Sequence, residues 1–198
     1  ILLRKKLGVD DSSPLDVFSL VQNLSGLSLV WYPMGEHLSG MCLKGANKTC
    51  IIAVNSSMSL GRQRFSLAHE LFHRFYDTNM RAICAQSISQ ETGKEIEKQA
   101  DRFASFLLMP PAALDLMTES LASRNQDDKL VIEDIIRIGQ YFGVSHKAAM
   151  VRLKGSPFMS RSKFELFFNE FAVKDIARAM GYRMDLYCPL PENMRYGT

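Results

Sequence analysis

Residues 60–76 read LGRQRFSLAHELFHRFY, which is the clearest helical pattern in the chain. The apolar residues recur with the period of a helix, at Leu60, Phe65, Ala68, Leu71, Phe72 and Phe75. We therefore expect one unbroken helix over residues 60–76, with an apolar side that faces a core. Within this helix His69 and His73 are four residues apart, and side chains at that spacing project from the same face.

The two histidines predict a metal site. In the pattern His69-Glu70-Leu71-Phe72-His73 both imidazoles can reach one ion. Glu70 lies one residue further round the helix, close to a water at the metal but poorly placed to be a ligand. The alternative is that two surface histidines happen to be four residues apart. The apolar residues around them argue against it, because a buried imidazole needs a polar partner.

A zinc ion that takes part in catalysis usually has three protein ligands and one water, so a third ligand is expected. Glu97 is the best candidate, because it opens a second expected helix, over residues 94–108, that can fold back across the first. Asp101 is one turn further on and faces the same way, where it can accept the second N–H of a ligand histidine. The alternative for Glu97 is a solvated carboxylate in a charged first turn, and Glu95 is then the fallback ligand.

Residues 27–55 are rich in aliphatic and aromatic side chains and predict a small sheet. Three strands are expected, at residues 27–31, 38–43 and 49–54. The turn-like stretch 44–48 joins the last two, which makes the sheet largely antiparallel. Before the sheet, Ser13 and Pro14 predict the start of a helix with Ser13 as its cap. After the first histidine helix, residues 77–92 are expected to be a polar connection.

Residues 110–155 are expected to be helical, with helices at about 110–122, 131–142 and 146–153. The composition changes after Pro157, so we expect one domain over residues 1–157 and a C-terminal helical extension of open role over residues 158–198. The extension carries an aromatic stripe that is either core or a partner surface: Phe164, Phe167, Phe168 and Phe171. The expected fold class is α+β, with a small, largely antiparallel three-stranded sheet packed on a helical domain and additional C-terminal helices.

Three motifs, in this order, resemble those of the ImmA/IrrE-type metallopeptidases: residues 62–73, 97–104 and 107–110. The resemblance covers about residues 1–155 and implies a zincin-like fold with one thermolysin-like zinc site per chain. It implies the zinc ligands His69, His73 and Glu97, with Glu70 as the catalytic residue. Two positions depart from the family pattern, because Phe72 stands where the family often has Gly and Asp101 where it often has Asn. Two imidazoles, one carboxylate and one water suit zinc better than manganese or iron.

The family's role implies a zinc-dependent endopeptidase of bacterial, phage or mobile-element origin. Its substrate would be a helix-turn-helix repressor, whose cleavage derepresses stress-response or mobile-element genes. In such a reaction Glu70 takes a proton from the attacking water and later delivers it to the leaving amine. The donor to the tetrahedral oxyanion stays open. The candidates are Tyr76 and His146, and also Arg74, His37 and Tyr141.

The bulk properties argue against nucleic-acid and membrane partners. The formal net charge of +3 is too small to indicate binding to a polyanion, and no apolar run approaches the ~18 residues of a membrane helix. The cysteines form no C-x-x-C pair, so we expect reduced thiols and a cytoplasmic protein. Two alternatives stay open: a metal-binding regulator that cleaves nothing, and a DNA-binding protein that uses the helix-turn-helix-like residues 135–153.

Overall fold

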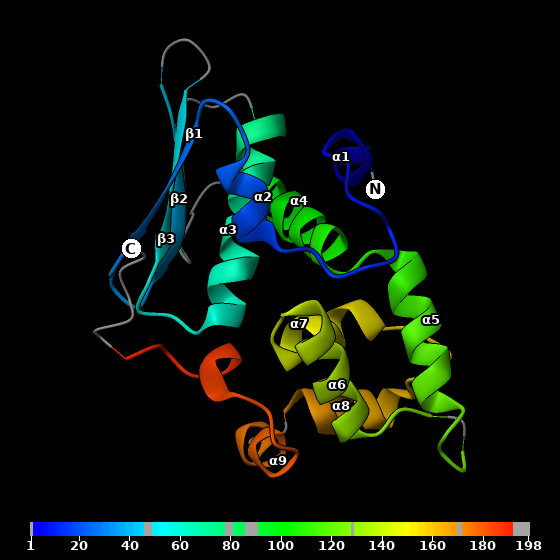
Figure 1. The fold of residues 1–198 in the computed structure, drawn as a ribbon. Coiled ribbons are helices and arrows are strands. Elements are labelled where there is room, and N and C mark those ends of the chain that lie inside the picture. Colours follow the sequence, from blue (N-terminus) through cyan, green and yellow to red (C-terminus); the bar gives the residue numbers. More distant parts are fainter. Residues whose placement is uncertain are drawn as a thin grey trace.

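The computed structural model describes residues 2–45, 49–77, 81–85, 91–127, 129–169 and 172–191, and its fold is α+β, as predicted. The strands are β1 (Leu27–Tyr32), β2 (Leu38–Lys44), β3 (Cys50–Asn55) and β4 (Arg81–Ala85). The helices are α1 (Leu2–Lys6), α2 (Val17–Gln22), α3 (Leu60–Tyr76), α4 (Glu91–Leu108), α5 (Pro111–Ala122), α6 (Ile132–Phe142), α7 (His146–Leu153), α8 (Arg161–Phe168), α9 (Val173–Ala179) and the 3-10 turn η2 (Met184–Leu186). Figure 1 shows the sheet along one side of α3, with α5 to α9 gathered below.

The sheet is mixed and has the strand order β1-β3-β2-β4. β2 pairs antiparallel with β3 and β4, whereas β1 and β3 run parallel. All three predicted strands are present, and a fourth joins them, because part of the expected polar connection 77–92 forms the edge strand β4. In the central strand β3 only Ile51 is exposed. A strand that is covered on both faces reads as a continuous apolar run, which explains its sequence.

The helix α3 spans the predicted residues 60–76 and lies between the sheet and α4. Its side chains Leu67, Ala68 and Leu71 are buried in the main core, as the apolar pattern indicated. α4 begins at Glu91 rather than at residue 94, and it ends at the predicted Leu108. The two long helices therefore face each other directly, and His69 and His73 of α3 are buried beside α4.

The helix expected to start at Ser13 starts later. α2 begins after Asp16, whose carboxylate accepts hydrogen bonds from two backbone N–H groups of the first turn. Ser13 is engaged elsewhere, because its hydroxyl donates to Asp10 at 2.6 Å and its carbonyl accepts from Arg4 at 2.6 Å. Arg4 is fully buried and also donates to the carbonyl of Leu107 in α4, at 2.6 Å. The loop before α2 is thus held in place by a buried guanidinium.

The aromatic stripe of the C-terminal segment faces the core. Phe167 is buried, and the rings of Phe164 and Phe168 stack beside it with centroids 5.4 Å apart. Phe171 lies outside the described residues. The helix α8 therefore packs as part of the body, and the described part of the stripe is core.

Residues 173–186 return to α6 and to the start of α3. Val173 and Ala177 of α9 form a small apolar cluster with the fully buried Ile136 of α6. Leu186 covers Gly61, where an added Cβ would come within 2.9 Å of the Leu186 carbonyl oxygen. The C-terminal residues thus shield the first turn of the histidine helix.

Cys42, Cys50 and Cys188 carry free thiols, and the side chain of Cys84 lies outside the described part of the chain. The sulfur atoms of Cys42 and Cys50 are 3.4 Å apart in the core. None of the helices in the described ranges combines the length and the apolar character that crossing a membrane requires.

Candidate metal centre

The helix α3 directs His69 and His73 toward one point. Both residues are buried, with 7% and 1% of their surface exposed. Their Nε2 atoms are 3.2 Å apart, and their ring centroids are 5.1 Å apart. The four-residue spacing produces this convergence because successive turns stack the two side chains on one face of the helix.

Glu97 of α4 completes the group. One carboxylate oxygen is 3.0 Å from Nε2 of His69, and the other is 3.5 Å from Nε2 of His73. One ligand atom from each of the three residues lies within 4.8 Å of the other two. Glu95 points elsewhere, because it is largely exposed and forms an ion pair with Lys98 at 3.6 Å. The geometry therefore selects Glu97 over the fallback ligand.

Two further carboxylates orient the imidazoles. Asp101 lies 2.9 Å from Nδ1 of His69, where the sequence reasoning placed it. Asp77 lies 2.9 Å from Nδ1 of His73, and the sequence reasoning missed it. A signal was present, because Asp77 follows His73 by four residues just as Asp101 follows Glu97. The side chain of Asp77 is 4% exposed, and Lys44 of β2 donates a hydrogen bond to its backbone carbonyl.

The donor set fits a zinc ion. Carboxylates at both Nδ1 atoms keep the Nδ1 protons in place, so both Nε2 atoms face Glu97 and both present lone pairs to it once His69 has released its second proton. Three electron-pair donors then surround one point, and they repel one another unless a cation lies between them. Zinc–nitrogen bonds of about 2.0–2.1 Å in a tetrahedral arrangement separate the donors by about 3.4 Å. The observed separations of 3.0, 3.2 and 3.5 Å bracket this value.

The protonation of the two imidazoles supports the same conclusion. Burial lowers the pKa of His69, but hydrogen bonds to Asp101 and Glu97 outweigh it and raise the pKa to about 9. Burial is the larger influence on His73 and lowers its pKa. Without a metal, the group thus holds one extra proton at neutral pH, on His69. The carboxylates that raise this pKa would also stabilise the positive charge of a metal ion, which must displace the proton to bind.

Glu70 lies beside the ligands in a space that β2 provides. It is fully buried between α3 and the sheet. An added Cβ on Gly40 would lie 3.1 Å from a carboxylate oxygen of Glu70 and 3.2 Å from the carbonyl oxygen of Ala53. Gly40 was not predicted from the sequence, since a glycine within a strand has no distinctive pattern. Its absent side chain leaves the room that the Glu70 carboxylate occupies.

Phe72 is one of the two departures from the family pattern, and its side chain packs from α3 against α4. Its ring meets the ring of His73 edge-on at 5.7 Å and lies 5.8 Å from Phe103 of α4. Tyr76 lies one turn later, with its ring 5.5 Å from Phe103. This aromatic group holds the two ligand-bearing helices together beside the metal centre.

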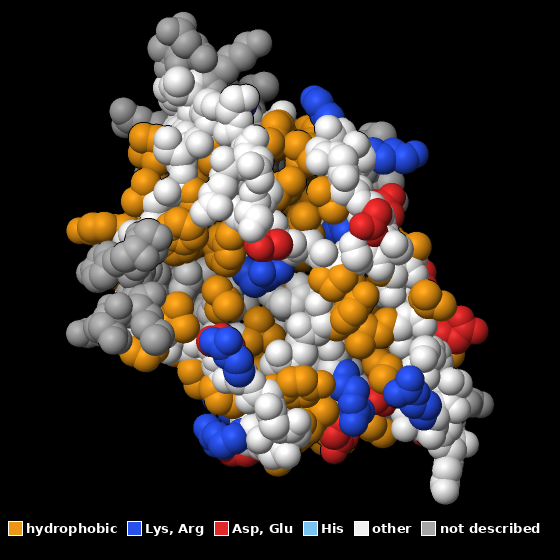
Figure 2. Space-filling model, in the orientation of Figure 1, with side chains coloured by type: hydrophobic (Ala, Val, Ile, Leu, Met, Phe, Trp, Pro, Cys, Tyr) orange, Lys and Arg blue, Asp and Glu red, His pale blue; other side chains and the backbone are white. Residues whose placement is uncertain are grey.

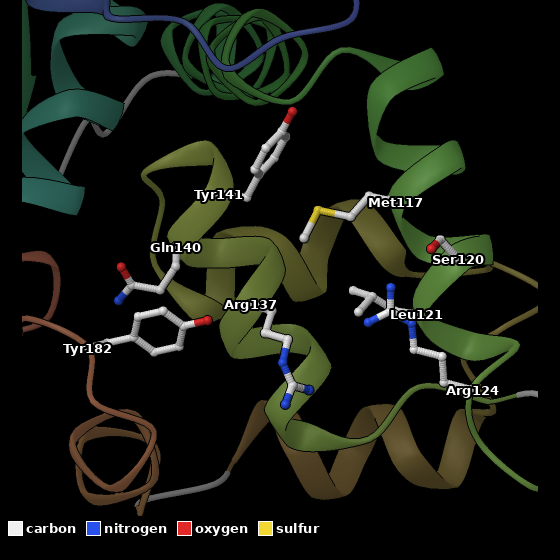
Figure 3. Close-up of a pocket in the computed structure, with 8 residues that line it drawn as sticks. All are labelled: Met117, Ser120, Leu121, Arg124, Arg137, Gln140, Tyr141 and Tyr182. Atoms are coloured by element: carbon white, nitrogen blue, oxygen red, sulfur yellow. The ribbon is translucent and has the colours of Figure 1, made fainter.

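The candidates for an oxyanion donor come from different elements of the fold and differ in their exposure. Tyr76 ends α3 and is 53% exposed, Arg74 lies in the same last turn, and His146 begins α7 and is half-buried. His37 is exposed in the turn between β1 and β2. Tyr141 lines a pocket of about 550 Å³ between α5, α6 and the segment after α9, and none of the three metal ligands lines it (Figure 3). The choice of donor stays a prediction.

Comparison with known protein families agrees with this geometry. A sequence model of the peptidase family described as "IrrE N-terminal-like domain" matches residues 33–154. The match runs from the loop before β2 to the end of α7 and contains every residue of the metal centre. A search of curated proteins finds no match to the chain.

Proposed function

The chain belongs to the peptidase family of IrrE N-terminal-like domains, and from this premise we propose that it is a zinc-dependent endopeptidase. Its proposed substrate is one protein partner, a helix-turn-helix repressor. The observation that carries the proposal is the convergence of His69, His73 and Glu97 next to the buried carboxylate of Glu70. A metal site that served only structure would have no need of a carboxylate in the position of Glu70, and it would favour a fourth protein ligand.

The residues of the chain divide the chemistry among themselves. His69, His73 and Glu97 would hold the zinc ion, which supplies Lewis acidity for the scissile carbonyl and lowers the pKa of water. Glu70 takes the proton of the attacking water and returns it to the leaving amine. Asp101 keeps the ring of His69 in one tautomer and one orientation, and Asp77 does the same for His73.

The test combines metal analysis with cleavage. Purified protein should contain about one zinc per chain by elemental analysis, and His69→Ala and Glu97→Ala should each lose it. Wild-type protein is then incubated with a panel of helix-turn-helix repressors, and fragments are identified by mass spectrometry. Glu70→Gln should keep the zinc and lower kcat/KM by about 10²–10⁴-fold, the range for a general base.

The outcomes separate the proposal from its rival. A zinc-free wild type that also refuses added zinc would overturn the metallopeptidase proposal. A chain that binds zinc and a repressor, and leaves the repressor intact in both wild type and Glu70→Gln, would instead be a metal-binding regulator.

A further inference from the structure

A pocket of about 480 Å³ lies beside the metal centre, between α3, α4 and α7. Asp101 lines it, and the same carboxylate lies 2.9 Å from Nδ1 of His69. Phe65, one turn before His69, lines it from α3. Pockets of this size typically hold a ligand larger than a single side chain. The pocket is therefore placed to take part of a substrate whose scissile bond lies at the metal.

The lining of this pocket is strongly cationic. Four basic side chains and one carboxylate line it: Lys98, Arg102, Lys147 and Arg152, with Asp101. The whole chain has a formal net charge of only +3, from 24 basic and 21 acidic residues. The positive charge is thus concentrated here, and a concave site with low-dielectric walls focuses the field of such charges on its contents.

Arg152 lines this pocket with a guanidinium that is only partly hydrogen-bonded. Its guanidinium lies 3.9 Å above the ring of Phe106, and Nη2 donates to the carbonyl of Met109 at 3.3 Å. Its Nε is buried and has no acceptor among the described residues. Arg102 lies over the same ring, at 5.7 Å. Burial lowers the pKa of Arg152, and the nearby charge of Arg102 lowers it further, although Asp115 opposes this.

The rest of the lining is apolar except for Ser105, whose hydroxyl donates to the carbonyl of Arg102. Phe65, Phe106, Ala148 and Val151 contribute side chains without a charge, and Val151 is 58% exposed at the rim. Several cationic side chains beside apolar surface favour a ligand that brings a carboxylate and covers apolar surface at the same time.

We infer that this pocket binds an acidic and apolar segment of the protein substrate. An Asp or Glu carboxylate of the segment lies against Arg102, Lys147 and Arg152, and a neighbouring apolar side chain covers Val151. The inference rests on the proposed endopeptidase function, since it names the part of the substrate that is held while the scissile bond is at the metal. Arg102, Lys147 and Arg152 are thus specificity residues of that reaction.

The shape of the pocket disfavours nucleic acid as the occupant. α6 and α7 form the helix-turn-helix-like pair of the sequence, but Lys147 and Arg152 of α7 line a concave space against α4. The phenyl rings and the Asp101 carboxylate in that space suit an acidic peptide better than a phosphate backbone. On the face drawn in Figure 2, basic side chains are interspersed with acidic ones.

The experiment selects peptides with an enzyme that cannot cleave them. Zinc-loaded Glu70→Gln protein is immobilised, and a display library of random 12-residue peptides is passed over it. We expect the selected peptides to contain Asp or Glu next to an apolar residue. Replacing that acidic residue by its amide should weaken binding about 10–100-fold, because the segment loses a charge-assisted hydrogen bond.

Charge reversal provides the decisive comparison. Arg102→Glu with Lys147→Glu, made in the Glu70→Gln protein, should abolish the acidic preference and select Lys or Arg in its place. Both side chains are exposed, so the fold should survive, and unchanged zinc content with unchanged circular dichroism verifies it. Lys154→Glu is the matched control, because Lys154 is exposed near the end of α7 and does not line the pocket. This control should keep the acidic preference.

Three results would overturn the inference: no enriched peptide, enrichment without acidic residues, or an acidic preference that survives the charge reversal. Displacement of the peptides by duplex DNA, lost on charge reversal, would assign the pocket to nucleic acid and would also overturn it. Because binding is measured without cleavage, these results are independent of the proposed function. Selected peptides that bind the pocket and are left intact by the wild-type enzyme would count against the endopeptidase proposal alone.

Discussion

Gly40 is the residue on which Glu70 depends for its space. The carboxylate of Glu70 and the Ala53 carbonyl both lie closer to the position of an added Cβ than ordinary packing allows, at 3.1 and 3.2 Å. We predict that Gly40→Ala keeps about one zinc per chain and lowers kcat/KM at least tenfold, because it displaces the general base without touching a ligand. Overpacking of this kind costs about 1–3 kcal/mol. Steady-state kinetics beside elemental analysis measures both quantities.

Gly35→Ala is the matched control for Gly40→Ala. An added Cβ on Gly35 would have no heavy atom within 4 Å, so the variant should retain wild-type kinetics. If Gly40→Ala were as active as this control, the reaction would not depend on the Glu70 carboxylate lying beside Gly40.

His69 makes zinc uptake dependent on pH. Its folded-state pKa is raised from 6.5 to about 9, so the interactions of the imidazolium stabilise the metal-free fold below pH 6.5 and are lost as the pH rises through about 9. Zinc must displace this proton, whereas the lowered pKa of His73 leaves that ring neutral. At pH 7 zinc binding should therefore release about one proton from the histidine pair.

Calorimetry in buffers of different ionisation enthalpy measures the number of protons released. Asp101→Asn removes the negative charge beside His69 and weakens the hydrogen bond that raises its pKa, so this variant should release fewer protons per zinc than wild type. Equal release from both proteins would contradict the assignment of the proton to His69.

At the scale of elements, the end of α3 is fixed to the sheet through Asp77. Its carboxylate orients His73, and its backbone carbonyl accepts a hydrogen bond from Lys44 of β2. We predict that Asp77→Asn weakens zinc affinity about 10–100-fold, as expected for a group that orients a metal ligand. Competition with a chelator of known affinity measures the change. Asp175→Asn is the control, since Asp175 is exposed and pairs with Arg178 of its own helix at 2.8 Å. A matching loss there would point to a general effect of charge.

Helices and strands could be predicted from the sequence where an apolar periodicity continued along the whole element. α3 has the predicted bounds because its apolar period and its histidine spacing agree along its full length. The start of α2 was misplaced at Ser13, because the competing partner Arg4 comes from an earlier part of the chain. Neither the parallel pairing of β1 with β3 nor the edge strand β4 has a local signal. Such pairings depend on residues far apart in sequence.

The metal centre likewise could be predicted from the sequence only where its residues lie close together along the chain. His69, Glu70 and His73 lie within one turn of a helix, so their mutual geometry follows from the helix alone. Glu97 depended on the assumption that α4 folds back across α3, and the structure places it there. Gly40 comes from a strand packed across the helix, and its role exists only in the packed structure. Local chemistry could therefore be predicted, while the space around it could not.

At the scale of the whole molecule, the family match ends at residue 154 but the packing does not. Phe167 of α8 lies in the same core as α3 and α4, and the apolar cluster around Ile136 is closed by α9. Leu186 covers Gly61 in the first turn of the histidine helix. Residues 158–191 therefore contribute to the stability of the helix that carries the metal ligands.

We accordingly predict that a chain ending at Pro157 is less stable than the full chain, and that the change reaches the metal centre. Removal of α8 and α9 exposes Ile136 and the side chains that pack against Phe167 to water, and each large apolar side chain so exposed costs about 1.5–3 kcal/mol. Urea unfolding should show a lower midpoint for the shortened chain. Leu186→Ala in the full chain should lower the midpoint by a smaller amount. The corresponding loss of unfolding free energy should be at most about 2–5 kcal/mol, the range for a truncated core leucine. A shortened chain with the full-length midpoint and zinc affinity would instead make residues 158–198 a separable extension.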